Sequence, residues 1–209
     1  MKSLYFFVAL VIGFFVVIVT SEKTLNIEHL AYNSLSEKLT AQEIDKFFEL
    51  QKKIKLIGYI INPLILLVKT CMVSIILYIG TYFFCKKKVS FKALWEIAIK
   101  AEFLFLLVSV CKLIWFYFFQ TNFILEDIQY FYPLSALNIL DYKGLDPWLI
   151  YPLQTLNLFE FTYIILLSYQ IGNLTKTNTD LGLKIVASSY IPALFLWVIV
   201  VMFFNLNFS

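Results

Sequence analysis

Residues 66–76 read LLVKTCMVSII, and one lysine, Lys69, lies in the middle of a run that is otherwise almost entirely apolar. Across the 209-residue chain, 61% of the residues are hydrophobic, whereas soluble domains contain about 45–50%. This composition predicts a multi-pass membrane protein. Lys69 must therefore be shielded from lipid by other parts of the fold.

The expected fold is all-α: a polytopic transmembrane helix bundle of about five spans with an amphipathic extramembrane helix. Long apolar runs with few charges predict membrane-spanning helices. The apolar run at residues 131–140 is too short to cross and is predicted to be interfacial or re-entrant. Asp146 followed by Pro147 predicts the start of a helix. The predicted spans are residues 4–20, 57–84, 103–119, 148–171 and 185–204.

Three parts are expected along the chain. Residues 1–20 are predicted to be an N-terminal membrane anchor or uncleaved signal, with a cleaved signal as the alternative, because a clear small-residue cleavage site is missing. Residues 21–56 are polar, and Thr40 and Glu43 have the spacing of a capping box. The helix that follows is amphipathic, and it either rests on the membrane surface or packs as a surface helix. Residues 57–209 are predicted to form a four-span membrane domain.

Lysines near the ends of the spans set the expected orientation. The three consecutive lysines at residues 86–88 indicate the cytoplasmic side of a bacterial inner membrane. The N-terminus is then inside, whereas residues 21–56, the loop at 120–146 and the C-terminus are outside. Three lysines near the end of the polar segment favour the opposite orientation: Lys52, Lys53 and Lys55.

Three ionisable residues fall near the centres of predicted spans: Lys69, Lys112 and Glu160. Each costs about 2.5–3.5 kcal/mol when it faces lipid at the bilayer centre. We therefore expect all three to lie at similar depth and to turn inward, with Glu160 paired to one of the lysines.

Polar neighbours accompany these charges. Asn157, Glu160 and Tyr163 are spaced three apart, which predicts one polar stripe on a helix face. Asn62 lies seven residues before Lys69, and Ser109 lies three residues before Lys112. Two interpretations of this intramembrane cluster remain open. The charges hold helices together or dock a partner's transmembrane helix, or they line a path for protons or an anion.

The sequence carries no recognisable catalytic motif. HExxH, GxSxG, P-loop and GxGxxG patterns do not occur. The cysteines Cys71, Cys85 and Cys111 show no metal-ligand spacing. The net charge of +3 is too small to suggest nucleic acid as a partner. We therefore expect a protein that is not an enzyme and that uses no cofactor or metal.

Four stretches resemble the Yip1-like family of membrane proteins, and the similarity extends from about Lys52 to the end of the chain. They are KKKVSFKALWEIAIKAEFLFLL at 86–107, YPLSALNILD at 132–141, LQTLNLFEFTYIILLSYQIG at 153–172 and LKIVASSYIPALFLWVIVV at 183–201. The resemblance implies a helical, multi-span, non-catalytic protein that acts through other membrane proteins or on membrane organisation. It also implies a structural role for Glu160 and supplies no catalytic residue.

The predicted function is that of an accessory or scaffold subunit of a larger membrane complex, concerned with protein transport or envelope assembly. Its expected partners are membrane lipid and the transmembrane helices of that complex. The alternative is a small transporter or channel component that uses Lys69, Lys112 and Glu160.

Overall fold

The computed structural model describes residues 2–36, 39–85 and 89–208, and every regular element in these ranges is a helix. The all-α prediction is therefore confirmed. The helices are α1 (Lys2–Thr24), α2 (Ile27–Ser36), α3 (Ala41–Phe84), α4 (Phe91–Phe118), α5 (Leu125–Tyr130), α6 (Leu137–Leu140), α7 (Pro147–Thr155), α8 (Leu158–Thr175) and α9 (Thr179–Phe208).

Three of the helices are long and apolar enough to cross a membrane. The candidate spans are Ser3–Thr24, Ile57–Phe84 and Thr179–Asn207, within α1, α3 and α9. Membrane association is thus supported for these helices, whereas the full set of five spans stays a prediction. The lysines at 86–88, which indicated the cytoplasmic side, lie outside the described residues.

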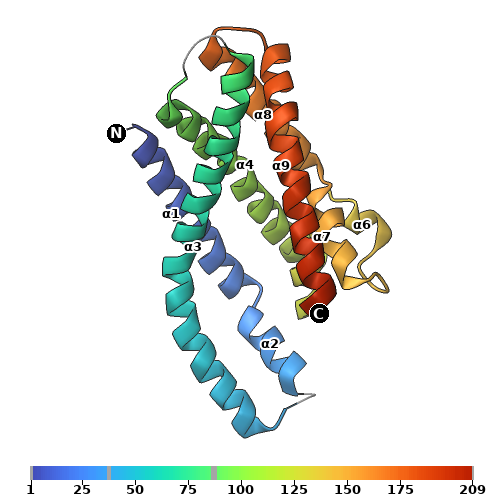
Figure 1. Cartoon of the computed structure of the whole chain (residues 1–209). Coiled ribbons are helices and arrows are strands. Elements are labelled where there is room, and N and C mark those ends of the chain that lie inside the picture. The colour runs from blue at the N-terminus through green and yellow to red at the C-terminus, as the bar shows by residue number, and fades with distance from the viewer. Residues whose placement is uncertain (1, 37–38, 86–88, 209) are drawn as a thin grey trace.

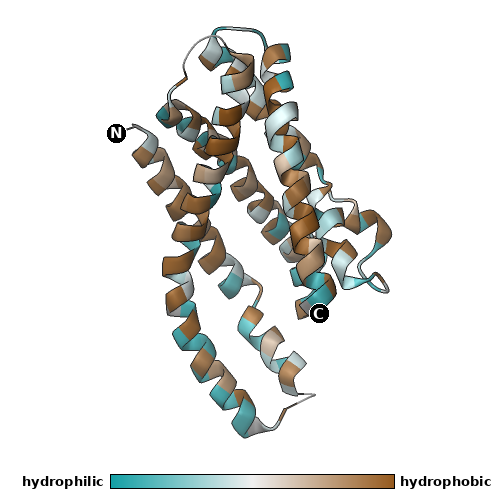
Figure 2. Cartoon of the chain, in the orientation of Figure 1, coloured by the Kyte–Doolittle hydropathy of each residue, from teal (hydrophilic) through white to brown (hydrophobic). Residues whose placement is uncertain are grey.

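The core lies where α3, α4, α8 and α9 pack together (Figure 1). The side chains at its centre are fully buried, and they come from all four helices. They include Leu77, Leu94, Leu167 and Ile185. Helix α1 packs along α4, and Figure 2 shows hydrophobic residues over most of the bundle.

Glycines allow two helix pairs to approach closely. A Cβ atom added at Gly182 of α9 would lie 2.0 Å from the backbone oxygen of Ser168 in α8. One added at Gly13 of α1 would lie 2.7 Å from a methyl group of Leu106 in α4. Membrane helices associate largely through such close packing, because lipid tails are as apolar as the side chains.

Helix α3 is one continuous helix, so the polar segment runs directly into a span. At its start, the Glu43 carboxylate accepts a hydrogen bond from the Thr40 backbone N–H at 2.9 Å, as the predicted capping box requires. The hydrogen bond from Thr40 also lowers the pKa of Glu43. Residues 41–56 extend about 24 Å along the helix axis before the span begins at Ile57.

Helix α2 packs against this first part of α3, and together they form a helical hairpin at the far end of the molecule (Figure 1). Ile44 is buried there, and the rings of Tyr32 and Phe48 stack with centroids 6.1 Å apart. Lys55 forms an ion pair with Glu22 at 2.8 Å. We call residues 27–36 together with 41–56 the N-terminal hairpin.

The prediction of one continuous helix over residues 148–171 is wrong. The chain leaves the helical conformation between α7 and α8, where Asn157 is extended with φ −142° and ψ 159°. Asn157 forms an isolated antiparallel bridge with Ser135, and the backbone N–H of Ala136 donates to the oxygen of Leu156 at 2.9 Å. These contacts with a distant loop satisfy the backbone groups that an unbroken helix would have used.

Candidate intramembrane charge site

Lys69 pairs with Glu102, which joins α3 to α4. The ammonium group donates a hydrogen bond to Oε1 of Glu102 and lies 4.1 Å from the centre of the Phe105 ring. The Glu102 side chain is 2% exposed, whereas that of Lys69 is 45% exposed. The amine in the apolar run is therefore tolerated because a buried carboxylate on the neighbouring helix compensates its charge.

Glu160 bonds to a tyrosine, and the expected ion pair between Glu160 and a lysine does not occur among the described residues. The Tyr190 hydroxyl of α9 donates a hydrogen bond to Oε1 of Glu160 at 2.7 Å. Glu160 lies in the first turn of α8, where the positive end of the helix dipole favours a carboxylate. This hydrogen bond joins α8 to α9.

Tyr163 lies between these two pairs and is fully buried. Its ring centre is 5.0 Å from that of Phe105 and 5.5 Å from that of Tyr190. Its hydroxyl interacts electrostatically with Glu102 and Glu160. Within the described part of the chain, this hydroxyl and Oε2 of Glu102 have no hydrogen-bond partner. We call Lys69, Glu102, Tyr163, Glu160 and Tyr190 the buried polar network.

Asn157 supports the network as the N-cap of α8. Its side-chain oxygen accepts a hydrogen bond from the Glu160 backbone N–H at 2.7 Å. Its amide nitrogen donates to the backbone oxygens of Gln154 at 2.8 Å and Thr155 at 3.0 Å. The predicted stripe of Asn157, Glu160 and Tyr163 is thus a cap followed by two helical residues, because Asn157 lies outside the helix.

Besides Asn157, three predicted site residues lie outside the network. Lys112 is half-buried and forms no ion pair or hydrogen bond with any residue that the structure describes. It is ten residues after Glu102, which is about 15 Å along α4, so the expectation that Lys112 lies level with Lys69 does not hold. Ser109 donates to the Phe105 backbone oxygen of its own helix at 3.3 Å. Asn62 is exposed and lines a groove beside Lys69.

Sequence reasoning missed two network residues, Glu102 and Tyr190. Tyr190 is thirty residues after Glu160 and carries no local signal, whereas Glu102 could have been found. The predicted third span began at residue 103, whereas α4 begins at Phe91. Glu96 and Lys100 form an i,i+4 ion pair at 2.7 Å on a more exposed face. Glu102 instead shares a face with Ala98 and Phe105, so its place in an apolar stripe was the signal that could have identified it.

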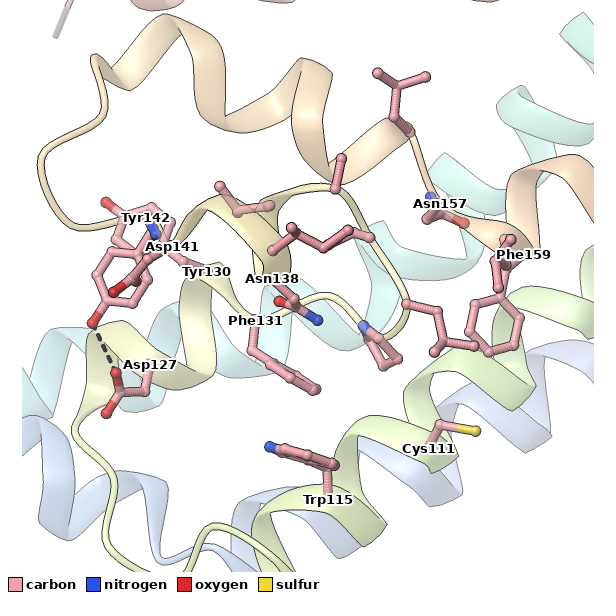
Figure 3. Close-up of a pocket in the computed structure, with 18 of the residues that line it drawn as sticks. Cys111, Trp115, Asp127, Tyr130, Phe131, Asn138, Asp141, Tyr142, Asn157 and Phe159 are labelled. Atoms are coloured by element: carbon pink, nitrogen blue, oxygen red, sulfur yellow. Dashed lines mark hydrogen bonds between the residues drawn. The ribbon is translucent and has the colours of Figure 1, made fainter.

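A second polar region borders a cavity of about 1180 Å³ between α4, the segment from α5 to α6, and the start of α8. Figure 3 shows Trp115 and Cys111 on one side of this cavity and Asn138 on the other. At one end of the cavity, the Tyr142 hydroxyl donates a hydrogen bond to Asp127 at 2.7 Å. Burial, together with this hydrogen bond, raises the pKa of Tyr142 above its usual value. The cavity contains none of the network's residues.

No protein-family model, curated protein or solved structure matches this chain. The resemblance to the Yip1-like family therefore stays a prediction that rests on the four quoted stretches. Within the described ranges, no group of three or more histidine, cysteine, aspartate or glutamate residues is placed to hold a metal ion.

The Tyr190–Glu160 hydrogen bond can be tested by a single substitution. Tyr190→Phe is expected to destabilise the protein by about 0.6–1.7 kcal/mol, which is the range from the average to the largest measured contribution of hydrogen bonds between membrane helices. Chemical unfolding in mixed micelles, followed by circular dichroism, measures the change. Tyr169→Phe is the matched control, because Tyr169 is 56% exposed on α8. Equal stability of the two variants would contradict the role of this bond.

Proposed function

We propose that this protein is a non-enzymatic, multi-pass subunit that supports a larger complex in the bacterial inner membrane. The N-terminal hairpin carries the proposal. It continues rigidly from a span and extends about 24 Å beyond it, and it exposes apolar side chains. Phe47, Leu50 and Ile54 are 41%, 58% and 63% exposed on one side of α3. An apolar surface of this kind outside the membrane favours a protein partner.

The arrangement of the helices supports five crossings. In Figure 1, α1, α3, α4, α8 and α9 run alternately up and down, so that α4 and α8 complete a bundle with the three helices that are long and apolar enough to cross a membrane. We propose that the N-terminus is cytoplasmic and that the hairpin and the C-terminus face outward. Residues 1–20 remain attached as an anchor in this proposal, which rests on the packing of α1 against α4.

The buried charges favour a structural role within this subunit. The Lys69–Glu102 pair joins α3 to α4, and the Tyr190–Glu160 bond joins α8 to α9. Both interactions form between helices of this chain, so neither needs a partner's transmembrane helix to form. We propose that the complex forms through the hairpin and that the buried polar network fixes the bundle that presents it. Protein transport and envelope assembly are the processes in which we place this complex.

Loss of the hairpin surface is expected to release the protein from its complex. We expect wild-type protein, purified in mild detergent, to carry a larger membrane complex in stoichiometric amounts. The Leu50→Glu/Ile54→Glu variant should lose at least 90% of that complex, because two charges replace exposed apolar contacts. Quantitative mass spectrometry of the co-purified chains measures the loss.

The matched control adds the same charges on polar positions of the same helix. Gln42 and Gln51 are both exposed, so Gln42→Glu/Gln51→Glu should keep the complex bound. Purification of the wild-type chain alone, as a homo-oligomer, would contradict the proposed function.

A transporter is the second candidate, and one observation favours it. Glu102 Oε2 and the Tyr163 hydroxyl are buried polar atoms that interact with each other but make no hydrogen bond of ordinary geometry to any described residue, and such groups occur along proton pathways in membrane proteins. Proton flux into liposomes that contain the purified protein alone, lost in Glu102→Gln, would favour this candidate over the subunit.

A further inference from the structure

A groove between α1, α3 and α4 reaches the Lys69–Glu102 pair. Its volume is about 420 Å³, which lies within the roughly 300–1,000 Å³ of small-molecule sites. Most of the lining is apolar, with Phe15 and Ile18 from α1 and Leu66 from α3. Lys69 and Glu102 supply charged groups to the same lining.

The polar groups in this groove have unused hydrogen-bonding capacity. Lys69 has three N–H donors and uses one of them on Glu102, and its side chain is 45% exposed. The side-chain amide of Asn62, on the same face of α3, has no hydrogen-bond partner within the described residues. The Glu102 side chain is only 2% exposed, and in the described part of the chain its Oε2 has no partner of ordinary hydrogen-bond geometry and interacts with the Tyr163 hydroxyl.

Depth in the membrane restricts what could satisfy these donors. Lys69 is 12 residues after Ile57, the first residue of the candidate span, so it lies about 18 Å inside that end. The hydrocarbon core is about 30 Å thick, which places the ammonium near its middle. Besides Glu102 and the Phe105 ring that Lys69 already contacts, a further acceptor that approaches from the lipid side at this depth would belong to a molecule dissolved in the hydrocarbon.

Charge restricts the acceptor further. Glu102 already neutralises Lys69, so an anionic ligand would add a net negative charge beside the Glu102 carboxylate. A neutral oxygen accepts a hydrogen bond from Lys69 without adding charge to the bundle. A carbonyl oxygen on a hydrocarbon tail has both properties that the groove requires.

We propose that this groove binds a lipid-soluble carbonyl compound, with its oxygen on Lys69 and its tail along α1 and α3. Two sources share this chemistry: a protonated fatty acid and an isoprenoid quinone. The groove opens sideways toward the lipid, between α1 and α3. Ile12 and Phe15 of α1 lie at the edge of this opening and are 57% and 47% exposed.

Equilibrium binding to the full chain in nanodiscs tests the proposal. The probes are radiolabelled palmitic acid and radiolabelled decylubiquinone, each titrated separately. We expect one of them to bind saturably with one molecule per chain, and the probe that saturates identifies the source. Leu66→Trp should weaken that binding at least tenfold by filling the groove. Val68→Trp is the control, since Val68 is 51% exposed and does not line the groove.

Photolabelling of the wild-type chain gives a result that does not depend on variant folding. Diazirine-tagged analogues of the two probes should label residues 11–18 and 59–69 in preference to other exposed apolar surfaces. Non-saturable binding of both probes, equal binding by the two tryptophan variants, or labels spread evenly over all spans would overturn the proposal.

Discussion

Glu102→Leu is expected to destabilise the protein by about 3–5 kcal/mol. The substitution leaves the Lys69 ammonium, which is 45% exposed toward the groove, without its carboxylate at mid-membrane depth. An unpaired lysine facing lipid there costs about 2.5–3.5 kcal/mol, and breaking a pair whose other partner is buried costs about 3–5 kcal/mol. The free energy of unfolding in mixed micelles, measured by circular dichroism during a denaturant titration, gives the change directly.

Removing both charges should recover most of the stability that Glu102→Leu loses. Replacing a buried ion pair with apolar residues of similar volume is often neutral or stabilising, so Lys69→Met/Glu102→Leu is expected to lie within about 1–2 kcal/mol of wild type. This double-mutant cycle separates a true pair from two independent sites. The cycle also needs the single variant Lys69→Met. If the double variant loses the sum of the Lys69→Met and Glu102→Leu losses, Lys69 and Glu102 do not act together.

The Glu96–Lys100 pair provides a matched control on the same helix. Its side chains are 28% and 41% exposed, and the two residues are one turn apart. Glu96→Leu is expected to cost less than about 1 kcal/mol, as exposed ion pairs contribute little. A loss equal to that of Glu102→Leu would show that any missing carboxylate on α4 destabilises the chain.

Gly182→Ala is expected to have the second-largest effect, a loss of about 3 kcal/mol. The added Cβ would lie 2.0 Å from the backbone oxygen of Ser168 and 3.1 Å from the backbone nitrogen of Gly172. Neither backbone atom can rotate away, so α8 and α9 must separate. Overpacking of this kind costs about 1–3 kcal/mol and occasionally more. The same unfolding measurement applies.

Gly58→Ala is the control for this substitution. A Cβ at Gly58 of α3 would meet nothing within 4 Å, and alanine is about 0.5–1 kcal/mol more favourable than glycine inside a helix. The variant should therefore be as stable as wild type or more stable. If Gly182→Ala behaves like Gly58→Ala, the two helices do not approach each other as described.

Local sequence patterns predicted the parts of the fold that depend on neighbouring residues. Thr40 and Glu43 identified the start of α3, since a capping box involves only four residues. The apolar runs at 4–20, 57–84 and 185–204 correspond to the three helices that can cross a membrane. The break at Asn157 was missed because it depends on a bridge to Ser135, twenty-two residues earlier.

The sequence by itself determined that the chain is helical, rich in apolar surface and in need of a partner for Lys69. Hydrophobicity and helical period are properties of short segments, so they can be read without knowing the fold. Only the tertiary structure decided that the partner is Glu102 and that Glu160 bonds to Tyr190. Which side chains meet depends on how the helices pack. More than one carboxylate in the sequence was a possible partner for Lys69, and the packing of α4 against α3 places Glu102 beside it.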